Sequence, residues 1–192
     1  KDKNPFGTYA IQKLLVPTYG NDIKVNKSTL YNLNTDSKLK HTVLLMNDRI
    51  KLSSTDLKTI FDFIKTGNTV FIAANQFNGL LADTFHLETN AELYSYFLKP
   101  DTLLKTPGVS LRMTAQNLDK KKYTYPLICF DSYFSHFDSS LFRSYSVNNA
   151  DRSVLIGAQI GKGKLYLMSM PDVFTNYFIV DQDRKSTRLN SS

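Results

Sequence analysis

The sequence contains little cysteine and no tryptophan, and the scarcity of cysteine narrows what the protein can be. A single cysteine, Cys129, stands among 192 residues, so an internal disulfide or a cysteine-based zinc site cannot form. Cys129 lies in the apolar run Leu127–Phe130, where we expect an inert, buried thiol. A nucleophilic cysteine would need an exposed position beside a base or a helix N-terminus, and the sequence shows neither.

Long apolar runs, histidine clusters and the common catalytic motifs are also missing. No stretch approaches the ~20 apolar residues with which a helix spans a bilayer. His41, His86 and His136 are far apart and form no metal-spaced pair. No GxSxG serine elbow occurs, and Gly157–Gly163 (GAQIGKG) lacks the spacing and the following hydroxyl of a phosphate loop. We therefore predict no metal, no cofactor and no catalytic residues, and we favour a binding protein over an enzyme.

The charge balance is basic, with a net charge of +7, but the pattern does not indicate a nucleic-acid partner. The dense run Lys120–Lys122 is typical of a solvated loop. A nucleic-acid site would need basic residues spread over one face together with stacking aromatic rings. The tail 183–192, DRKSTRLNSS, resembles the translation of a sequencing adapter. We therefore expect a single domain over residues 1–182 and an artefactual tail after it.

A strand, an amphipathic helix and a second strand form the clearest pattern in the chain. Ser53 and Asp56 fit a capping box at the start of the helix. Val43–Met46 and Thr69–Ala74 flank the helix as continuous apolar runs, which are typical of strands covered on both faces. We expect the two strands to be parallel neighbours in the middle of a covered sheet. One face of the helix carries four apolar residues at helical spacing: Leu57, Ile60, Phe61 and Ile64.

The second half of the chain predicts more β-structure. Between Thr89 and Tyr125 the prolines and a glycine interrupt every periodic pattern, which indicates an irregular or β-rich insertion. Ser153–Ile160 and Lys164–Met170 are two strands joined by the turn Gly161–Gly163, which suits a hairpin. We therefore predict an α/β fold with a mainly parallel central sheet, a β-rich insertion and a C-terminal β-hairpin.

Polar residues follow both strands of the central unit. In open α/β sheets, ligands bind beyond the carboxyl ends of the strands, and the capped start of the first helix could add free amides for an anion. Ordinary turn and cap chemistry is the simpler explanation of the same residues. The predicted ligand-binding set is Asn4, Gly7, Thr8, Asn47, Asp48, Asn75, Gln76, Thr175 and Asn176.

Three segments together carry a family resemblance. They are NPFGTYA at 4–10, LSSTDLKTIFDFIKTGNTVFIAA at 52–74 and GKGKLYLMSMPDVFTNY at 161–177. In this order they resemble the DUF4350 family, which is placed with class I glutamine-amidotransferase-like domains, and the resemblance covers most of residues 4–178. It implies a flavodoxin-like α/β sandwich of unknown activity in a membrane-associated bacterial protein, because members are often anchored by helices outside the domain. True amidotransferases have a nucleophilic cysteine after a central strand. The matching turn Ala74–Phe77 has none, so we expect no cysteine-dependent glutaminase activity.

Three functions remain as expectations. The first is a non-catalytic ligand- or partner-binding domain, with a protein partner in a membrane complex. The second is a hydrolase or transferase whose polar residues Asp48, Asn75 and Asn176 converge in one pocket. The third is a glycan- or polymer-binding surface on the aromatic segment Tyr125–Phe142, which requires exposed rings. Because the chain starts at Lys1 rather than at methionine, we interpret it as a fragment. The family resemblance implies that its membrane segments lie outside this fragment, so we expect the domain itself to be soluble, with an extracytoplasmic location as one option.

Overall fold

The structure is a computed structural model, and it describes residues 3–4, 7–23, 30, 40–92, 109–114, 122–125, 131–177 and 179. The chain forms two compact units, a smaller one from residues 1–28 and 171–192 and a larger one from Thr29–Met170. The predictions for Cys129 and for the tail 183–192 concern residues outside those described. The same holds for Lys120 and Lys121, whereas Lys122 begins a strand.

The larger unit contains most of the regular structure. Its helices are α2 (Ser54–Lys65) and α3 (Leu80–Phe85). Its strands are β1 (Thr42–Met46), β2 (Arg49–Lys51), β3 (Thr69–Ala73), β4 (Gln76–Asn78), β5 (Glu88–Glu92), β6 (Val109–Met113), β7 (Lys122–Tyr125), β8 (Asp131–His136), β9 (Arg143–Val147), β10 (Ser153–Ile160) and β11 (Gly163–Met168). The smaller unit contains α1 (Tyr9–Tyr19) and two 3-10 turns, η1 (Gly20–Asp22) and η3 (Pro171–Phe174).

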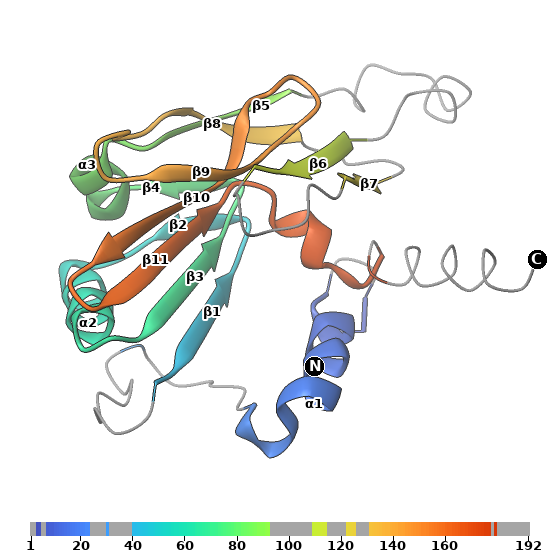
Figure 1. The fold of residues 1–192 in the computed structure, drawn as a ribbon, viewed down its shortest axis with the longest axis horizontal. Coiled ribbons are helices and arrows are strands. Elements are labelled where there is room, and N and C mark those ends of the chain that lie inside the picture. Colours follow the sequence, from blue (N-terminus) through green and yellow to red (C-terminus); the bar gives the residue numbers. More distant parts are fainter. Residues whose placement is uncertain are drawn as a thin grey trace, which may run out of the picture. The chain divides into compact units, whose positions relative to one another are not determined.

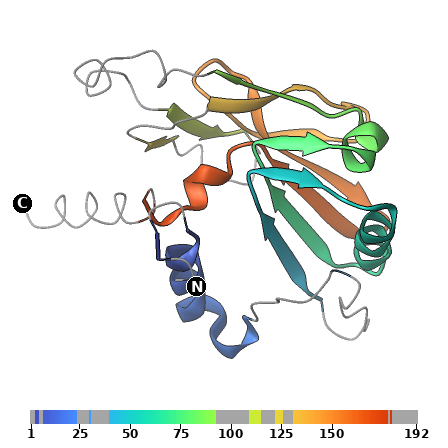
Figure 2. The ribbon, with the colours of Figure 1, turned by 180° about the vertical axis from the view of Figure 1, so that it is seen from behind.

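Seven strands of the larger unit form one mixed sheet in the order β1-β3-β11-β10-β9-β6-β7 (Figure 1). β3 pairs in parallel with β1 on one side and with β11 on the other, and the remaining pairs are antiparallel. The same strands can be followed from behind in Figure 2. Two small sheets accompany them, the parallel pair β2-β4 and the antiparallel pair β5-β8.

This architecture is mostly β, so the predicted flavodoxin-like, class I glutamine-amidotransferase-like α/β sandwich is wrong. Only β1, β3 and β11 form the parallel part of the sheet, and α2 and α3 are the only α-helices described in the larger unit. Each parallel connection needs a long crossover, whereas β9, β10 and β11 follow one another as antiparallel neighbours. An apolar run shows that a strand is buried, but it does not show the direction of the strand beside it.

The central strand–helix–strand unit has the predicted parallel pairing but not the predicted position. Val43 lies opposite Val70, and Leu45 opposite Ile72. β1 is one of the two edge strands of the sheet, however, and Leu44 is 43% exposed. The prediction that both strands occupy the middle of a covered sheet is therefore wrong for β1. An edge strand can be equally apolar when only one of its faces is packed against the core.

The start of α2 forms as the sequence predicts. Ser53 Oγ accepts a hydrogen bond from the backbone amide of Asp56 at 3.1 Å, and it donates to Asp56 Oδ2 at 2.7 Å. The carboxylate also lies in the first turn, where the helix dipole favours negative charge. This cap satisfies one of the amides that a helix leaves unpaired at its beginning.

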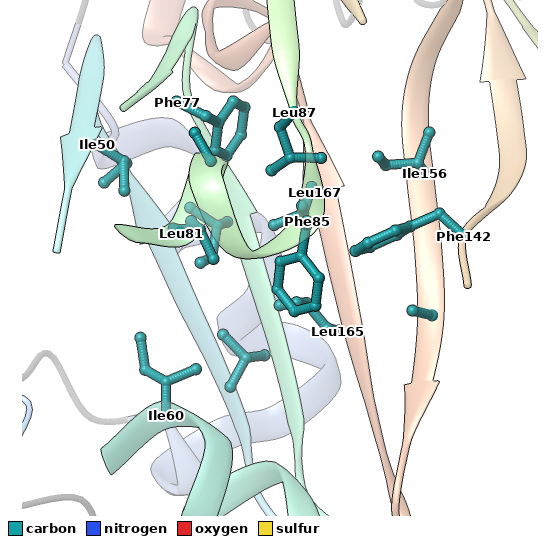
Figure 3. Close-up of a cluster of buried hydrophobic side chains, with 14 of the residues drawn as sticks. Ile50, Ile60, Phe77, Leu81, Phe85, Leu87, Phe142, Ile156, Leu165 and Leu167 are labelled. Atoms are coloured by element: carbon teal, nitrogen blue, oxygen red, sulfur yellow. The ribbon is translucent and has the colours of Figure 1, made fainter. Parts of the chain in front are cut away.

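The core of the larger unit lies between its two helices and one face of the sheet (Figure 3). Alternation along β3 and β11 places Val70 beside Leu165 and Ile72 beside Leu167 on this face. Phe142 packs edge-to-face on Phe85 of α3, with ring centroids 5.1 Å apart. The buried helix residues of this core are Leu57, Ile60, Phe63, Ile64, Leu81, Ala82 and Phe85.

The aromatic segment contributes to this core rather than to an open surface. Phe134 is 4% exposed and Phe142 is 2% exposed. Phe137 packs against the same cluster, and Arg152 lies over the half-buried ring of Tyr133, 4.3 Å from its centroid. Since a glycan surface on this segment required exposed rings, the structure removes two of them from that role.

The hairpin between β10 and β11 is confirmed, and its tip is fixed by a close approach to α2. Gly161 has φ of +58°, a conformation that favours glycine. A Cβ atom on Gly163 would lie 2.1 Å from the backbone oxygens of both Asn68 and Ile64. Only glycine fits at this position, because any side chain would collide with the end of the helix and the start of β3.

Candidate functional site

The nine predicted ligand-binding residues fall into two groups, one in each unit. The smaller unit contains Asn4, Gly7, Thr8, Thr175 and Asn176. The larger unit contains Asn47, Asp48, Asn75 and Gln76.

In the smaller unit, Asn176 ties the beginning of the chain to its far end. Its Nδ2 donates to the backbone oxygen of Asn4 at 2.7 Å, and its backbone amide donates to the oxygen of Gly7 at 2.8 Å. Its Oδ1 accepts from the amide of Ala10 at 2.6 Å, so one amide of the first turn of α1 already has a partner. Thr8 stands at the N-cap position without a side-chain capping bond. These contacts hold α1 in place, and any ligand role of this group stays a prediction.

In the larger unit, the turns after β1 and β3 run side by side. The amide of Asn47 donates to the oxygen of Ala73 at 3.0 Å, and the amide of Gln76 donates to the oxygen of Asp48 at 3.1 Å. These two bonds continue the parallel pairing beyond the strands and lead into the small sheet β2-β4. As a result, the side chains of Asp48 and Asn75 meet, with Asn75 Nδ2 donating to Asp48 Oδ1 at 3.0 Å.

A polar hollow of about 320 Å³ opens at this meeting point. We call it the Asn75 pocket; it is lined by Asp48, Arg49, Asn75, Gln76, Thr89, Asn90 and Ala91. It therefore contains three of the predicted residues, while Asn47 and Asn176 are not among its lining residues. The alternative of a hydrolase or transferase required Asp48, Asn75 and Asn176 in one pocket, and this pocket brings only the first two together.

Asn75 is the buried member of the pocket, with 9% of its surface exposed. Its backbone oxygen accepts from Ser132 Oγ at 3.1 Å, which anchors it to β8. Its side-chain Oδ1 is buried and finds no hydrogen-bond partner among the described residues. Leaving a buried acceptor unpaired costs about 1–3 kcal/mol. Such groups are rare in native structures, and each calls for an explanation.

The charges of the pocket balance, because its described lining holds one carboxylate and one guanidinium. Arg49 Nε lies 3.6 Å from Asp48 Oδ2, and the two side chains are 70% and 66% exposed. Thr89 is the only hydroxyl side chain among the lining residues, and neither histidine nor a second carboxylate accompanies it. In the described part of the chain, no group of three histidine, cysteine, aspartate or glutamate residues could hold a metal ion. This arrangement can bind a polar ligand but has no nucleophile–base pair.

Sequence reasoning missed four of the lining residues. Arg49 directly follows Asp48, and its position in the same turn was a usable signal. Thr89, Asn90 and Ala91 belong to β5, which reaches the pocket through its pairing with β8. No local sequence pattern predicts the pairing of β5 with β8, because the two strands lie about 40 residues apart in the chain.

Comparison with known proteins gives a family and several similar folds. A family model described as "Domain of unknown function (DUF4350)" matches residues 1–190, and a comparison with curated proteins found no match. The mmIFT52 N-terminal domain is similar with a TM-score of 0.58 at 12% identity, over 97% of this chain and 91% of that chain.

Two bacterial glycosidases contain a similar region. The exo-β-1,4-mannosidase Op5Man5 from Opitutaceae bacterium strain TAV5 has a TM-score of 0.50 at 10% identity, over 81% of this chain and 24% of that chain. A catalytic mutant of Gan42B, a GH42 β-galactosidase from G. stearothermophilus, has a TM-score of 0.50 at 16% identity, over 95% of this chain and 27% of that chain. The chain thus spans about a quarter of the length of these enzymes. At such identities the likeness concerns the fold alone.

No helix among the described residues combines the length and the apolar character that crossing a membrane requires.

Proposed function

The chain belongs to the DUF4350 family, and from that premise we propose that its larger unit is a non-catalytic ligand-binding domain whose site is the Asn75 pocket. One observation carries the proposal: Asn75 lines a polar hollow at the strand ends, and its buried Oδ1 has no hydrogen-bond partner among the described residues. An acceptor kept in that state reduces stability, and such costs are retained where a function needs them.

The lining chemistry supports binding without turnover. Acyl transfer needs a nucleophile, a base that orients it and donors for an oxyanion. The lining residues offer amides, one carboxylate, one guanidinium and one threonine hydroxyl. The Asp48 carboxylate is already engaged by Asn75 Nδ2 and lies close to Arg49. This carboxylate is therefore placed to accept hydrogen bonds from a ligand.

A combined binding and turnover experiment tests the proposal. The purified chain would be titrated with inorganic phosphate, ethanolamine, L-glutamine and myo-inositol while backbone amide shifts are recorded. The same preparation would be incubated with L-glutamine and with p-nitrophenyl acetate. We expect one of the titrants to shift amides around the Asn75 pocket and neither substrate to be hydrolysed. Hydrolysis that disappears in Asn75→Leu would contradict the proposal, as would the absence of any shift at the pocket.

We further propose that the domain belongs to a membrane-associated bacterial protein with a protein partner in a membrane complex. This part rests on the family resemblance alone, since members are often anchored by helices outside the domain. Fractionation of cells that express the full-length gene tests it. We expect the protein in the membrane fraction, and release of the full-length protein by a high-salt wash would argue against anchoring helices.

A further inference from the structure

We infer that the ligand of the Asn75 pocket is a small neutral polyol, bound through neighbouring hydroxyl groups. This inference rests on the proposed function, because it names the class of ligand for the same site. It is carried by the balance of charge in the pocket, by the mixture of donors and acceptors on its walls, and by its size.

Charge balance disfavours ions as ligands. The described lining residues carry one positive and one negative group, Arg49 and Asp48, within 3.6 Å of each other. An anion such as phosphate is usually held by several cationic groups or by a run of backbone amides. A hard cation needs several oxygen ligands, mostly carboxylates, and the lining offers only one carboxylate. A neutral ligand leaves the Asp48–Arg49 pair intact.

The lining residues include both hydrogen-bond acceptors and donors. Asn75 contributes a buried acceptor, Oδ1, and Asp48 a carboxylate beside it. Asn90 Oδ1 already accepts from the amide of Ala91 at 2.8 Å, so the amide nitrogen of Asn90 is the part of that side chain left to donate. Arg49 adds guanidinium donors. A hydroxyl group both donates and accepts, so adjacent hydroxyls can satisfy such a wall without any change of charge.

The buried Oδ1 explains how binding could be specific. It is out of contact with solvent, so a ligand hydroxyl reaches it only after a rotation of the Asn75 side chain. The same rotation moves Nδ2 away from Asp48 Oδ1, so the bound state is favoured only by a ligand that pairs Oδ1 with one hydroxyl and replaces the lost bond to Asp48 with a neighbouring hydroxyl. A ligand without an O–H or N–H donor at this point gains nothing from the rotation. Such a ligand binds more weakly, because it leaves a buried polar group of the pocket without a hydrogen-bond partner.

The size of the pocket and its lack of rings limit the polyol. A volume of about 320 Å³ is at the small end of ligand pockets, which span about 300–1,000 Å³. No aromatic side chain is among the described lining residues, so the site offers no stacking platform for the apolar face of a sugar ring. These features favour a compact polyol over an extended glycan.

A matched series of ring compounds tests this inference. Cyclohexanol, 1,2-cyclohexanediol and myo-inositol share one carbon ring and differ in the number of hydroxyls. Titrations of the full chain would follow backbone amide shifts at the pocket. We expect affinity to rise from cyclohexanol to the diol to myo-inositol. We expect Asn75→Leu to weaken myo-inositol binding by about tenfold, the effect of one lost buried hydrogen bond.

Two further variants keep the test decisive. Asn78→Ala changes an exposed asparagine on β4 outside the pocket lining, and we expect it to bind myo-inositol as the wild type does. Asp48→Asn alters a side chain that is 66% exposed, so it can be measured even if Asn75→Leu fails to fold. We expect Asp48→Asn to weaken binding severalfold. Unchanged binding in Asp48→Asn and in a folded Asn75→Leu would overturn the inference.

The charged titrants separate failure of this inference from failure of the proposed function. If phosphate, ethanolamine or L-glutamine shifts the pocket amides and myo-inositol does not, the ligand class is wrong and the binding function stands. Equal affinities of cyclohexanol and myo-inositol would likewise overturn the polyol assignment alone. If no titrant shifts these amides, both the inference and the proposed function fall.

Discussion

Two buried asparagines stand at opposite ends of β3, and they differ in how completely their side chains are paired. Asn68, before the strand, is 2% exposed: its Oδ1 accepts from the amide of His41 at 2.8 Å, and its Nδ2 donates to Phe63 O and Thr66 Oγ1 at 3.0 and 2.9 Å. Asn75, after the strand, is 9% exposed and has one side-chain bond and an unpaired Oδ1. Asn68 thus has a structural role at one end of β3, whereas Asn75 is a candidate ligand-binding residue at the other end.

The difference follows from what surrounds each side chain. At the Asn68 end, α2, β3 and the tip of the β10–β11 hairpin converge, and the amide of Lys164 donates to the backbone oxygen of Asn68 at 3.1 Å. At the Asn75 end, the chain opens into the hollow between the turns and β5. A fully paired buried amide contributes to stability, whereas a partly paired one reduces it. Substitution of Asn68 should therefore lower the free energy of unfolding more than substitution of Asn75.

The largest expected effect comes from adding a side chain at Gly163, which is tightly packed against the backbone at the Asn68 end of β3. Gly163→Ala would place Cβ 2.1 Å from two backbone oxygens, which forces the hairpin away from α2. We expect a loss of about 4 kcal/mol in the free energy of unfolding, measured by urea denaturation. The matched control is Gly157→Ala, whose Cβ would lie 2.6 Å from the ring of Tyr166 and 2.9 Å from the ring of Tyr145. These nearest atoms belong to half-buried side chains rather than to the backbone, so we expect a smaller loss than for Gly163→Ala. An equal loss in both variants would contradict the proposed role of the close backbone contact.

The next largest effect is expected from removing the side chain of Asn68. Asn68→Ala deletes three side-chain hydrogen bonds. It leaves the part-buried amide of His41 without this partner, whereas the oxygen of Phe63 still accepts from Thr66 Oγ1 at 2.7 Å. We expect the free energy of unfolding to fall by about 3 kcal/mol. Denaturation with urea, followed by circular dichroism, measures it. A loss below about 1 kcal/mol would show that water replaces the missing amide.

A much smaller effect is expected at the other end of the strand. Asn75→Leu removes an unpaired buried acceptor, which favours folding, and one hydrogen bond to an exposed carboxylate, which disfavours it. These terms are of similar size and opposite sign, so we expect stability within about 1 kcal/mol of the wild type. The same denaturation experiment decides the matter. If this variant loses as much stability as Asn68→Ala, Asn75 also has a structural role, and the proposed difference between the two asparagines is wrong.

The smallest effect is expected for an asparagine that belongs to neither end. Asn78 is exposed on β4, and Asn78→Ala should change the free energy of unfolding by no more than about 0.5 kcal/mol. This variant sets the baseline for the asparagine series. A larger loss would mean that asparagine substitutions here carry a general cost, and the values for Asn68 and Asn75 would need correcting by that amount.

Prediction from sequence succeeded where the decisive contacts are local. The Ser53 cap and the glycine hairpin depend on residues a few positions apart, so their patterns are visible in the chain itself. The apolar face of α2 was predicted only in part: Leu57, Ile60 and Ile64 are buried, but the fourth buried residue is Phe63 rather than the predicted Phe61, which is half-buried. The parallel pairing of β1 with β3 also followed, because the connection between the two strands contains one amphipathic helix, α2, whose pattern is visible in the sequence.

Prediction from sequence failed where the fold depends on pairing between strands that are distant in the chain. The apolar runs around α2 were interpreted as central strands of a parallel sheet, yet β1 is an edge and β11 enters beside β3. For the candidate site, Asp48 and Asn75 could be named because they follow adjacent strands. The wall formed by Thr89, Asn90 and Ala91 could not, because the pairing of β5 with β8 places it there.

The amino-acid sequence alone determined the local elements of this protein and the polar residues that follow its strands, because caps, turns and periodic apolar faces act over a few residues. Only the tertiary structure decided the order and direction of the strands and which of the two asparagines keeps an unpaired side-chain oxygen. Those outcomes depend on pairings between segments far apart in the chain, where many partners have similar composition and only three-dimensional packing selects one.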